Sequence, residues 1–240
     1  MKVLITGAGT GFGRLTAIEL ARRGHEVHAG VMSTVEAEDF KTIDRIEPIQ
    51  LDITKAEDRG RAAGLSVDVL VNNAGVSQLG PLALMPMERA RQVFEVNVFG
   101  TLAMTQACVP AMLARGSGRV LFVSSIAGVS AGAMAGPYAM SKHAMQAMGA
   151  SLREELAPQG VDVLLANPGA FGTGFNDRMF ESLSEWLAGK DEETYRPFVQ
   201  ALSNAVTVGQ LDPTDAANRL ADLCEAETTE LINPIPKGLF

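Results

Sequence analysis

The sequence predicts an α/β fold built on a doubly wound parallel sheet. Two observations predict it: short apolar runs alternate with longer segments of helical periodicity, and most apolar runs end in small or polar residues. This alternation is typical of βαβ units in a parallel sheet. The length of 240 residues fits one large domain, and 47% hydrophobic residues supply a substantial core. We therefore expect a single domain over residues 1–240, with a substrate-loop region at about 170–206.

Composition narrows the functional classes. The formal net charge is -8, from 20 basic and 28 acidic residues, and no basic face suggests nucleic acid. The chain runs from Met1 straight into a glycine loop without a signal-peptide core, and no apolar run approaches a membrane span. Cys108 and Cys224 lie in apolar helical contexts, and the histidines lack metal-ligand spacing. We expect a cytoplasmic protein without a metal site, a nucleic-acid partner or a membrane partner.

The N-terminal segment predicts an anion-binding site. Residues 2–6 form an expected buried strand, a glycine-rich loop continues to Gly13, and an expected helix runs from Arg14 to Arg23 with Gly24 as its cap. At such a junction, backbone N–H groups and the helix dipole face a phosphate, and glycines let the backbone come close. A merely tight turn between strand and helix is the alternative. The position near the N-terminus favours dinucleotide binding.

The next two expected strands, Glu26–Val31 and Ile46–Leu51, leave the nucleotide preference open. Dinucleotide-binding folds usually place an acid for the adenine ribose, or a base for a 2′-phosphate, after the second strand. Residues 31–34 of this chain are neither acidic nor basic. Asp52, which ends the third strand, could accept from the adenine amino group or cap a helix that starts near Lys55.

Two features mark the middle of the chain. The fourth expected strand, 67–71, ends in Asn72-Asn73-Ala74-Gly75, whose small residues let a flat ring approach the backbone. A long helix is expected from Glu88 to Ala114. Its expected buried stripe consists of Phe94, Val98, Leu102, Thr105 and Val109. Asn97 stands out in this helix, because an inward amide is either a satisfied core polar group or part of a water or proton relay.

The second half of the chain continues the pattern. The fifth strand, 119–123, ends at the hydroxyls of Ser124 and Ser125, and open α/β sheets bind ligands at such ends. The sixth strand, 161–166, is followed by Asn167-Pro168-Gly169. From 170 to 206, apolar and aromatic residues are scattered among polar ones, which fits an apolar lid or an ordinary pair of surface helices. A helix from Asp212 and a short strand at 230–233 end the fold.

Tyr138 and Lys142 lie four residues apart in an expected helix over 138–156, so their side chains share one face. A free tyrosine, with a pKa of about 10, is a poor acid or base at neutral pH. A nearby ammonium favours the phenolate and lowers that pKa. The pair can therefore pass a proton to or from an alcohol or carbonyl oxygen. Taken alone, such a pair is more often a surface contact, so its meaning depends on the other motifs.

With these motifs in order, the chain resembles the short-chain dehydrogenase/reductase family, in its compact single-domain branch with a Rossmann-like fold. The likeness covers residues 1 to about 175 by motif. Residues 6–13 resemble the family's TGxxxGxG loop, residues 72–75 match its NNAG strand end, and Pro168-Gly169 with Thr173 resembles its nicotinamide-binding loop. The family's four catalytic positions fall on Asn97, Ser125, Tyr138 and Lys142. Ser125, and not Ser124, has the family's thirteen-residue offset from the tyrosine.

The resemblance implies a role for each matched position. Tyr138 would be the general acid in reduction and the base in oxidation, and Lys142 would hold the nicotinamide ribose and lower the Tyr138 pKa. Ser125 would hydrogen-bond the substrate oxygen, and Asn97 would keep a water that links Lys142 to solvent. The implied cofactor-binding residues are Gly7, Thr10, Gly11, Phe12, Gly13, Met32, Asp52, Ile53, Asn73, Ala74, Gly75, Tyr138, Lys142, Pro168, Gly169 and Thr173.

The sequence departs from the family's pattern in two places. NADP-preferring members often carry a basic residue at the place of Thr10 or Met32, and NAD-preferring members an acid at Val31, but this chain has none of these. A 2′-phosphate without a cation loses water and gains little, so the sequence leans towards NAD. A preference for NADP would instead point to Lys41 or Arg45. The span between the third and fourth strands is also short, so its helix should be abbreviated.

The expected activity is that of an NAD(P)-dependent alcohol dehydrogenase or carbonyl reductase. The expected substrate is a secondary alcohol or ketone with apolar bulk, and the expected assembly a homodimer or homotetramer. One alternative is a dinucleotide-binding regulator without turnover, which would be expected to have lost Tyr138 or Lys142. Another is an isomerase or lyase that uses the same pair on a sugar nucleotide, although that branch generally has a different glycine spacing and a larger C-terminal domain. Product analysis with both nicotinamides and a ketone panel would separate the three.

Overall fold

The computed structural model describes residues 1–239, in which seven strands form one parallel sheet of order β3-β2-β1-β4-β5-β6-β7. The strands are β1 (Lys2–Ile5), β2 (Glu26–Val31), β3 (Ile46–Gln50), β4 (Val69–Asn72), β5 (Gly118–Val123), β6 (Val161–Pro168) and β7 (Ile232–Ile235). The chain starts in the middle at β1, fills one side with β2 and β3, and then crosses to β4 and the other side. This is the expected doubly wound arrangement, and its switch point lies between β1 and β4.

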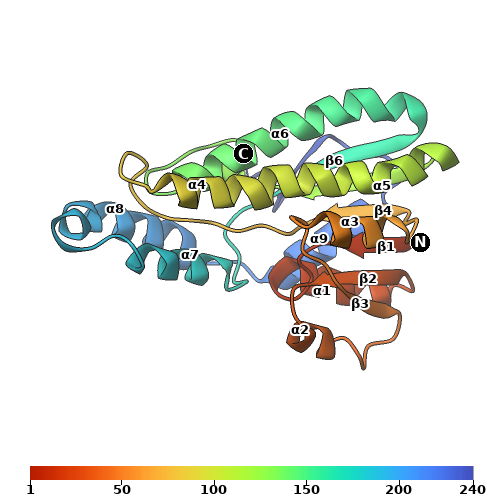
Figure 1. Cartoon of the computed structure of the whole chain (residues 1–240), viewed down its shortest axis with the longest axis horizontal. Helices are drawn as coiled ribbons and strands as arrows, with labels where there is room; N and C mark the ends of the chain where they lie inside the picture. The colour runs from red at the N-terminus through yellow and green to blue at the C-terminus, as the bar shows by residue number, and fades with distance from the viewer. Residues whose placement is uncertain (240) are drawn as a thin grey trace.

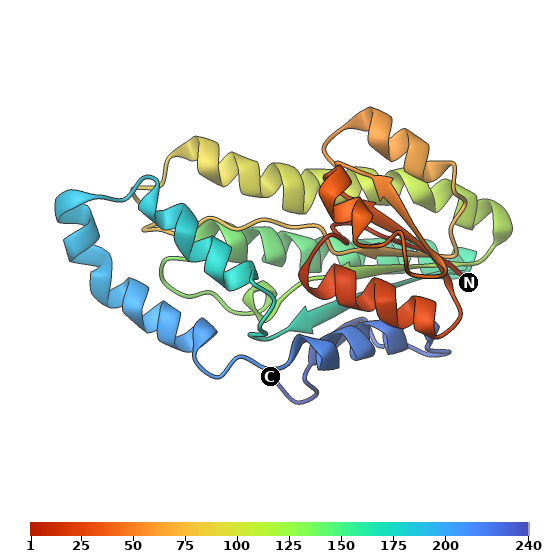
Figure 2. The same cartoon turned by 90° about the horizontal axis from the view of Figure 1, so that it is seen from below.

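Helices cover both faces of the sheet (Figures 1 and 2). On one face α1 (Gly11–Arg22) and α9 (Pro213–Glu225) lie side by side, and α2 (Thr34–Glu38) follows β2. On the other face are α3 (Ala56–Ala63), α4 (Met87–Phe94), α5 (Thr101–Arg115) and α6 (Gly136–Leu156). Each face has its own apolar core. Cys224 is buried in the first core and Cys108 in the second, both as free thiols, as the sequence predicts.

Element boundaries differ from the sequence expectations by a few residues. β4 and β7 each begin two residues later than expected, and the catalytic-motif helix α6 begins at Gly136 with Pro137 in its first turn. Helix α2 is an element that the sequence pattern did not predict. The abbreviated helix expected before β4 is confirmed, because α3 has only eight residues.

The long helix expected at 88–114 contains a change of winding. A π-helical turn, η1 (Glu95–Gly100), separates α4 from α5. A π turn takes one extra residue, so the positions before it rotate relative to those after it. The expected stripe is therefore wrong in its first half: Val93, Asn97 and Thr101 are buried, whereas Phe94, Val98 and Leu102 are only half-buried. The π turn thus aims Asn97 into the protein.

The same helical run also corrects the expectation about membrane-length segments. Among the described residues, Met87–Arg115 is one run of 29 residues whose mean hydropathy of 1.4 would allow a membrane span by length and composition alone. Its inner side packs on the sheet through Met104, Cys108 and Met112. Packing on the sheet accounts for this apolar character within the fold.

The segment expected to be a lid or a helix pair is a helix pair. It consists of α7 (Phe175–Ser184) and α8 (Gly189–Thr207), which extend beyond one end of the sheet (Figure 1). The pair forms a small apolar core through Met179, Leu183 and Leu187, which meet Met134 of the loop after β5 and Leu79 of the loop after β4. Trp186 fixes the pair to that loop, because its indole Nε1 donates to the Leu79 carbonyl at 3.1 Å. A Cβ on Gly80 would lie 1.9 Å from the Trp186 ring, so this contact requires glycine.

Candidate active site

The glycine loop after β1 forms a backbone cradle without room for side chains. Gly7 has φ +62°, and a Cβ added there would lie 2.8 Å from the Cα of Ala74. A Cβ on Gly13 would lie 2.5 Å from both the Gly7 carbonyl oxygen and the Asn73 Nδ2. Such distances are shorter than real side chains tolerate, so glycine is required at both positions. The loop therefore presents backbone to whatever binds over it.

Asn73 holds this loop in place from the end of β4. Its Nδ2 donates to the carbonyl oxygens of Thr6, at 3.0 Å, and of Gly7, at 2.9 Å. In return, the Thr6 hydroxyl accepts from the N–H groups of Asn73 and Ala74, both at 3.0 Å. The Asn-Asn-Ala-Gly segment thus supports the cradle from beneath. Thr6, which the sequence analysis counted in the glycine motif without a role of its own, is therefore a positioning residue of the cradle.

The N-terminus of α1 suits a phosphate group. Its N-cap residue, Thr10, makes no side-chain capping bond, and its first turn holds no acidic residue. Elsewhere Ser33 caps α2 and Asp212 caps α9. The first N–H groups of α1 therefore remain available to an anion, which the helix dipole also favours. The cradle and this uncapped helix end fit the pyrophosphate of a dinucleotide.

The loop after β6 closes over the glycine loop. A Cβ on Gly11 would lie 3.2 Å from the Cβ of Thr173, and the rings of Phe12 and Phe171 meet edge to face at 5.4 Å. Gly169 is tied to the neighbouring strand, since its N–H donates to the Ile235 carbonyl at 2.9 Å. The structure thus brings Pro168, Gly169 and Thr173 to the same edge as the cradle. Pro168 is the last residue of β6.

Tyr138 and Lys142 share one face of α6, as expected from their spacing. The Lys142 Nζ lies 5.6 Å from the centre of the Tyr138 ring and donates to the Val123 carbonyl at 2.8 Å. Burial lowers the pKa of Lys142 to about 7. Burial also raises the pKa of Tyr138 to about 12, and a hydrogen bond with Ser125 opposes part of that rise. The net rise of the Tyr138 pKa comes from burial, and the role implied for Lys142 in lowering it stays a prediction.

Asn97 is a satisfied core polar group. Its Nδ2 donates to the Val76 carbonyl at 2.9 Å and to the Ser141 hydroxyl at 3.0 Å, and its Oδ1 accepts from the Val76 N–H at 2.8 Å. The Ser141 hydroxyl donates onward to the Tyr138 carbonyl at 2.8 Å. The amide uses both of its donors within the protein, so only one Oδ1 lone pair is left for water. Ser141, which sequence analysis missed, links Asn97 to the backbone of the tyrosine.

The two serines after β5 have different environments. Ser124 is buried, and its hydroxyl accepts from Gln146 Nε2 at 3.0 Å. The Ser125 hydroxyl accepts from the Ala127 N–H at 3.1 Å and hydrogen-bonds Tyr138. The Asn167 side chain donates to the Ser125 carbonyl at 3.1 Å and so fixes its backbone. This geometry supports the choice of Ser125 over Ser124, and it adds Asn167 as a positioning residue.

Asp52 forms a local turn and does not cap α3. Its carboxylate accepts from the Thr54 N–H at 3.0 Å and from the Thr54 hydroxyl at 2.6 Å, whereas the N-cap of α3 is Lys55. Burial acts to raise the pKa of Asp52, but the hydrogen bonds from Thr54 hold it below its usual value. Ile53 is buried against Gly100 of the π turn. The capping alternative is therefore wrong, and the contact of Asp52 with the adenine amino group stays a prediction.

Phe175, the first residue of α7, lies beside the tyrosine. The two ring centres are 5.5 Å apart, and the Phe175 N–H donates to the Thr173 hydroxyl at 3.3 Å. The helix pair thus places an aromatic side chain next to Tyr138. Sequence analysis grouped Phe175 with the scattered apolar residues of that segment, and no local signal distinguished it.

A doubly wound sheet with a glycine cradle at its switch point, and a Tyr–Lys pair whose lysine is buried beside it, is typical of nicotinamide-dependent oxidoreductases. Residues 1–184 match the sequence profile of the family described as short chain dehydrogenase. The chain belongs to this family, as the resemblance indicated, and it is an oxidoreductase that uses a nicotinamide cofactor.

Known proteins of the family cover nearly the whole chain. The sequence is 31% identical to the uncharacterized oxidoreductase YusZ of Bacillus subtilis, over 98% of this chain and 89% of the relative. It is 33% identical to human 17-beta-hydroxysteroid dehydrogenase type 1, over 98% of this chain and 75% of the relative. A short chain dehydrogenase from Burkholderia cenocepacia, solved in complex with NADP, superposes with a TM-score of 0.76 at 28% identity, covering 97% of this chain and 86% of that one.

Proposed function

We propose that the protein is an NAD(P)-dependent alcohol dehydrogenase or carbonyl reductase, acting on a secondary alcohol or ketone with apolar bulk. One observation carries the proposal. Ser125, at the carboxyl end of β5, lies near enough to Tyr138 to act on its pKa, and the buried Lys142 lies beside the tyrosine ring. Two neighbouring hydroxyls can both reach one substrate oxygen, so that one gives it a proton and the other a hydrogen bond.

The side chains divide the work between them. Tyr138 donates its proton to the carbonyl oxygen in reduction and accepts it back in oxidation, while Ser125 donates a second hydrogen bond to the same oxygen. Lys142 has a pKa of about 7, so it can hold a proton or release it near neutral pH. When charged, it would stabilise the phenolate that Tyr138 forms. A bound nicotinamide dinucleotide would supply or accept the hydride. Its pyrophosphate would be held by the cradle at Gly7 and Gly13 and by the N-terminus of α1.

The surroundings of Tyr138 support a substrate with apolar bulk. Phe175 lies against the tyrosine ring, and the core of the helix pair contains Leu79, Met134 and Met179 beyond it. The related hydroxysteroid dehydrogenase is named for a large apolar substrate, which agrees with this proposal.

Hydride transfer to defined ketones tests the proposal directly. The purified chain would be incubated with NADH or NADPH and a panel of ketones that runs from short acyclic to bulky cyclic compounds. We expect oxidation of the reduced nicotinamide and a secondary alcohol as product, with kcat/KM rising with apolar size. Binding of nicotinamide without turnover of any ketone or alcohol would favour the regulator, and product formation without net nicotinamide oxidation would favour the isomerase or lyase.

We also propose a homodimer or homotetramer in a reducing, cytoplasmic setting. Apolar side chains remain exposed along the outer side of the α4–α6 layer, namely Met87, Phe99 and Met140, each about half exposed. Beside Met140 lies a cavity of about 860 Å³, lined by Phe94, His143 and Phe198 among others. A second copy of the chain would cover this apolar surface. Light scattering after size-exclusion chromatography measures the assembly, and a single species at 25.4 kDa would contradict it.

A further inference from the structure

The carboxylate of Glu36 occupies the space between β2 and the glycine loop. Its Oε2 accepts from the N–H of Met32, the first residue after β2, at 2.8 Å. A Cβ added to Gly9 would lie 2.3 Å from the Glu36 carboxyl carbon and 2.4 and 2.8 Å from its two oxygens. The carboxylate therefore lies directly on the backbone of the cradle, and Gly9 is the residue that makes room for it.

Helix capping alone does not explain this position. The Ser33 hydroxyl accepts from the Glu36 N–H at 3.2 Å, which is one half of a capping box. In the complete box, the glutamate would reach back to the N–H of the N-cap residue, Ser33. Here the Glu36 carboxylate instead accepts from the N–H of the preceding residue, Met32, beside Gly9. Capping accounts for Ser33, and it leaves the contact with the glycine loop unexplained.

The Glu36 carboxylate has no cation beside it within the described residues. Each nearby cation is engaged elsewhere: Lys41 pairs with Glu38, and Arg14 with Asp39 at 3.5 Å. Arg45 donates to the Gly24 carbonyl at 3.4 Å, at the opposite end of β2. Lys41 and Arg45, to either of which a preference for NADP would point, make no contact with Met32 in the part of the chain that the structure describes. The end of β2 carries a negative charge without a neutralising partner.

We propose that Glu36 is the residue that selects NAD over NADP, supplied from α2 because the end of β2 carries no acid. The inference rests on the proposed function, since it concerns the same dinucleotide site. A carboxylate beside the Gly9 backbone offers two oxygens as acceptors for the hydroxyls of the adenine ribose. A 2′-phosphate would instead have to displace this carboxylate from the Met32 N–H, and it would meet a like charge that no cation offsets.

Two single substitutions in the same short helix test the assignment. Glu36→Gln keeps size and removes the charge at the cradle, and Glu38→Gln removes an exposed charge on the same helix as a matched control. Both are made in a Lys41→Gln background, because Glu38 pairs with Lys41 and its loss would otherwise release a cation near the site. Dissociation constants of NAD⁺ and NADP⁺ would be measured by isothermal titration calorimetry, without substrate, so that binding is read independently of turnover. Melting temperatures of both variants without nucleotide report any loss of capping.

We expect the unmodified protein to bind NAD⁺ at least about tenfold more tightly than NADP⁺, the effect of one charge-assisted contact. Glu36→Gln should reduce that ratio by about tenfold or more, whereas Glu38→Gln should leave it within about twofold. If Glu36→Gln and Glu38→Gln had the same ratio of NAD⁺ to NADP⁺ affinity, the inference would be overturned. Glu36 would then serve only to cap α2, and the proposed function would be unaffected. A tenfold preference for NADP⁺ would overturn it as well. Failure of the unmodified protein to bind either dinucleotide would overturn both proposals.

Discussion

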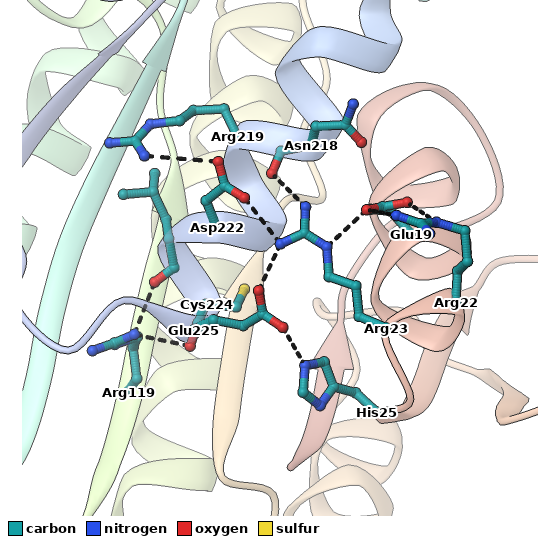
Figure 3. Close-up of polar contacts among 11 residues, drawn as sticks. Glu19, Arg22, Arg23, His25, Arg119, Asn218, Arg219, Asp222, Cys224 and Glu225 are labelled. Carbon is teal, nitrogen blue, oxygen red and sulfur yellow. Dashed lines mark hydrogen bonds and ion pairs between the residues drawn. The ribbon is translucent and has the colours of Figure 1, made fainter.

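Among the residues that the structure describes, charged side chains are paired with opposite charges at one edge of the sheet, and a charged side chain lacks such a partner at the other edge. At the edge where the strands begin, Arg23 meets three carboxylates: Glu19 at 2.7 Å, Asp222 at 2.9 Å and Glu225 at 2.6 Å (Figure 3). His25 shares Glu225 with it at 2.6 Å. At the edge where the strands end, Lys142 is buried with a neutral carbonyl, that of Val123, as its hydrogen-bond partner.

The pKa values follow this difference. The hydrogen bond from Arg22 is the main cause that lowers the pKa of Glu19 to about 2, against the opposing effect of burial. Although burial works against its charge, Arg23 has a raised pKa because of the same carboxylates. At the other edge, burial alone lowers the pKa of Lys142 to about 7. Paired groups thus keep their charge, while the unpaired lysine is brought to the pH range in which it can exchange a proton.

The edge where the strands begin contributes mainly to stability, and the edge where they end holds the groups that can take part in a reaction. The charged network in Figure 3 joins α1 to α9 and ties Arg119 at the start of β5 to the carbonyls of Leu223 and Cys224. These contacts hold one helical layer on the sheet. The opposite edge leaves a buried charge unpaired, which costs stability and is kept only where function requires it. Substitutions at the two edges should therefore have separable effects.

The largest effect is expected for Tyr138→Phe at the catalytic edge. The ring and its packing remain, but the proton carrier is lost, so kcat should fall by about 10²–10⁴-fold. Nucleotide affinity and melting temperature should hardly change. Tyr195→Phe on α8 is the matched control and should keep full turnover. Turnover of Tyr138→Phe within a few-fold of the unmodified protein would show that another group carries the proton.

The next largest effect is expected for Gly13→Ala. The added Cβ would lie 2.5 Å from the Gly7 carbonyl oxygen, so the cradle must move apart. Overpacking of this size costs about 1–3 kcal/mol, which corresponds to about a 5–150-fold loss of nucleotide affinity when the strain acts on the bound state. Gly60→Ala in α3 has open space and serves as control. Calorimetric titration with nucleotide measures the two affinities. Equal affinity of Gly13→Ala and Gly60→Ala would show that the loop is not part of the binding site.

At the opposite edge, Glu19→Gln should lower the free energy of unfolding by about 1–2 kcal/mol at pH 7 without affecting kcat. The folded pKa of Glu19 is about 2 and its ordinary value is 4.5, so this stabilisation is present above pH 4.5 and disappears as the pH falls towards 2. Urea unfolding of both proteins across that range measures it. A difference that is independent of pH would assign the effect to packing and not to charge.

The smallest effect is expected for Lys142→Met, and it has the opposite sign. The folded lysine has a pKa of about 7 and the unfolded one 10.5, so unfolding takes up a proton between these values and stability rises with pH there. Methionine avoids the cost of burying the charge, partly offset by the lost bond to Val123. The variant should gain about 1 kcal/mol at pH 6, with the gain declining towards pH 10.5. A destabilised variant at pH 6, in urea unfolding, would contradict the comparison.

The sequence by itself determined the parts of this protein that depend on neighbouring residues. Sequence analysis correctly predicted the alternation of strands and helices and the glycine loop at 6–13. It also correctly predicted that Tyr138 and Lys142, four residues apart, share one face of a helix. Their physical basis is local: backbone conformation and the face on which a side chain lies follow from residues a few positions away. The choice of Ser125 over Ser124 came from the family's spacing, and the geometry supports it.

Tertiary structure decided what depends on distant contacts. The π turn at Glu95–Gly100 shifts the buried stripe of the long helix and seats Asn97 against Val76, which no helical periodicity announces. The position of Glu36 over Gly9 joins residues on two different βα units. The pKa of Lys142 follows from burial among elements that are far apart in the chain. Burial and long-range approach are properties of the packed fold, so a reading of local pattern could place these residues on their elements but not assign their partners.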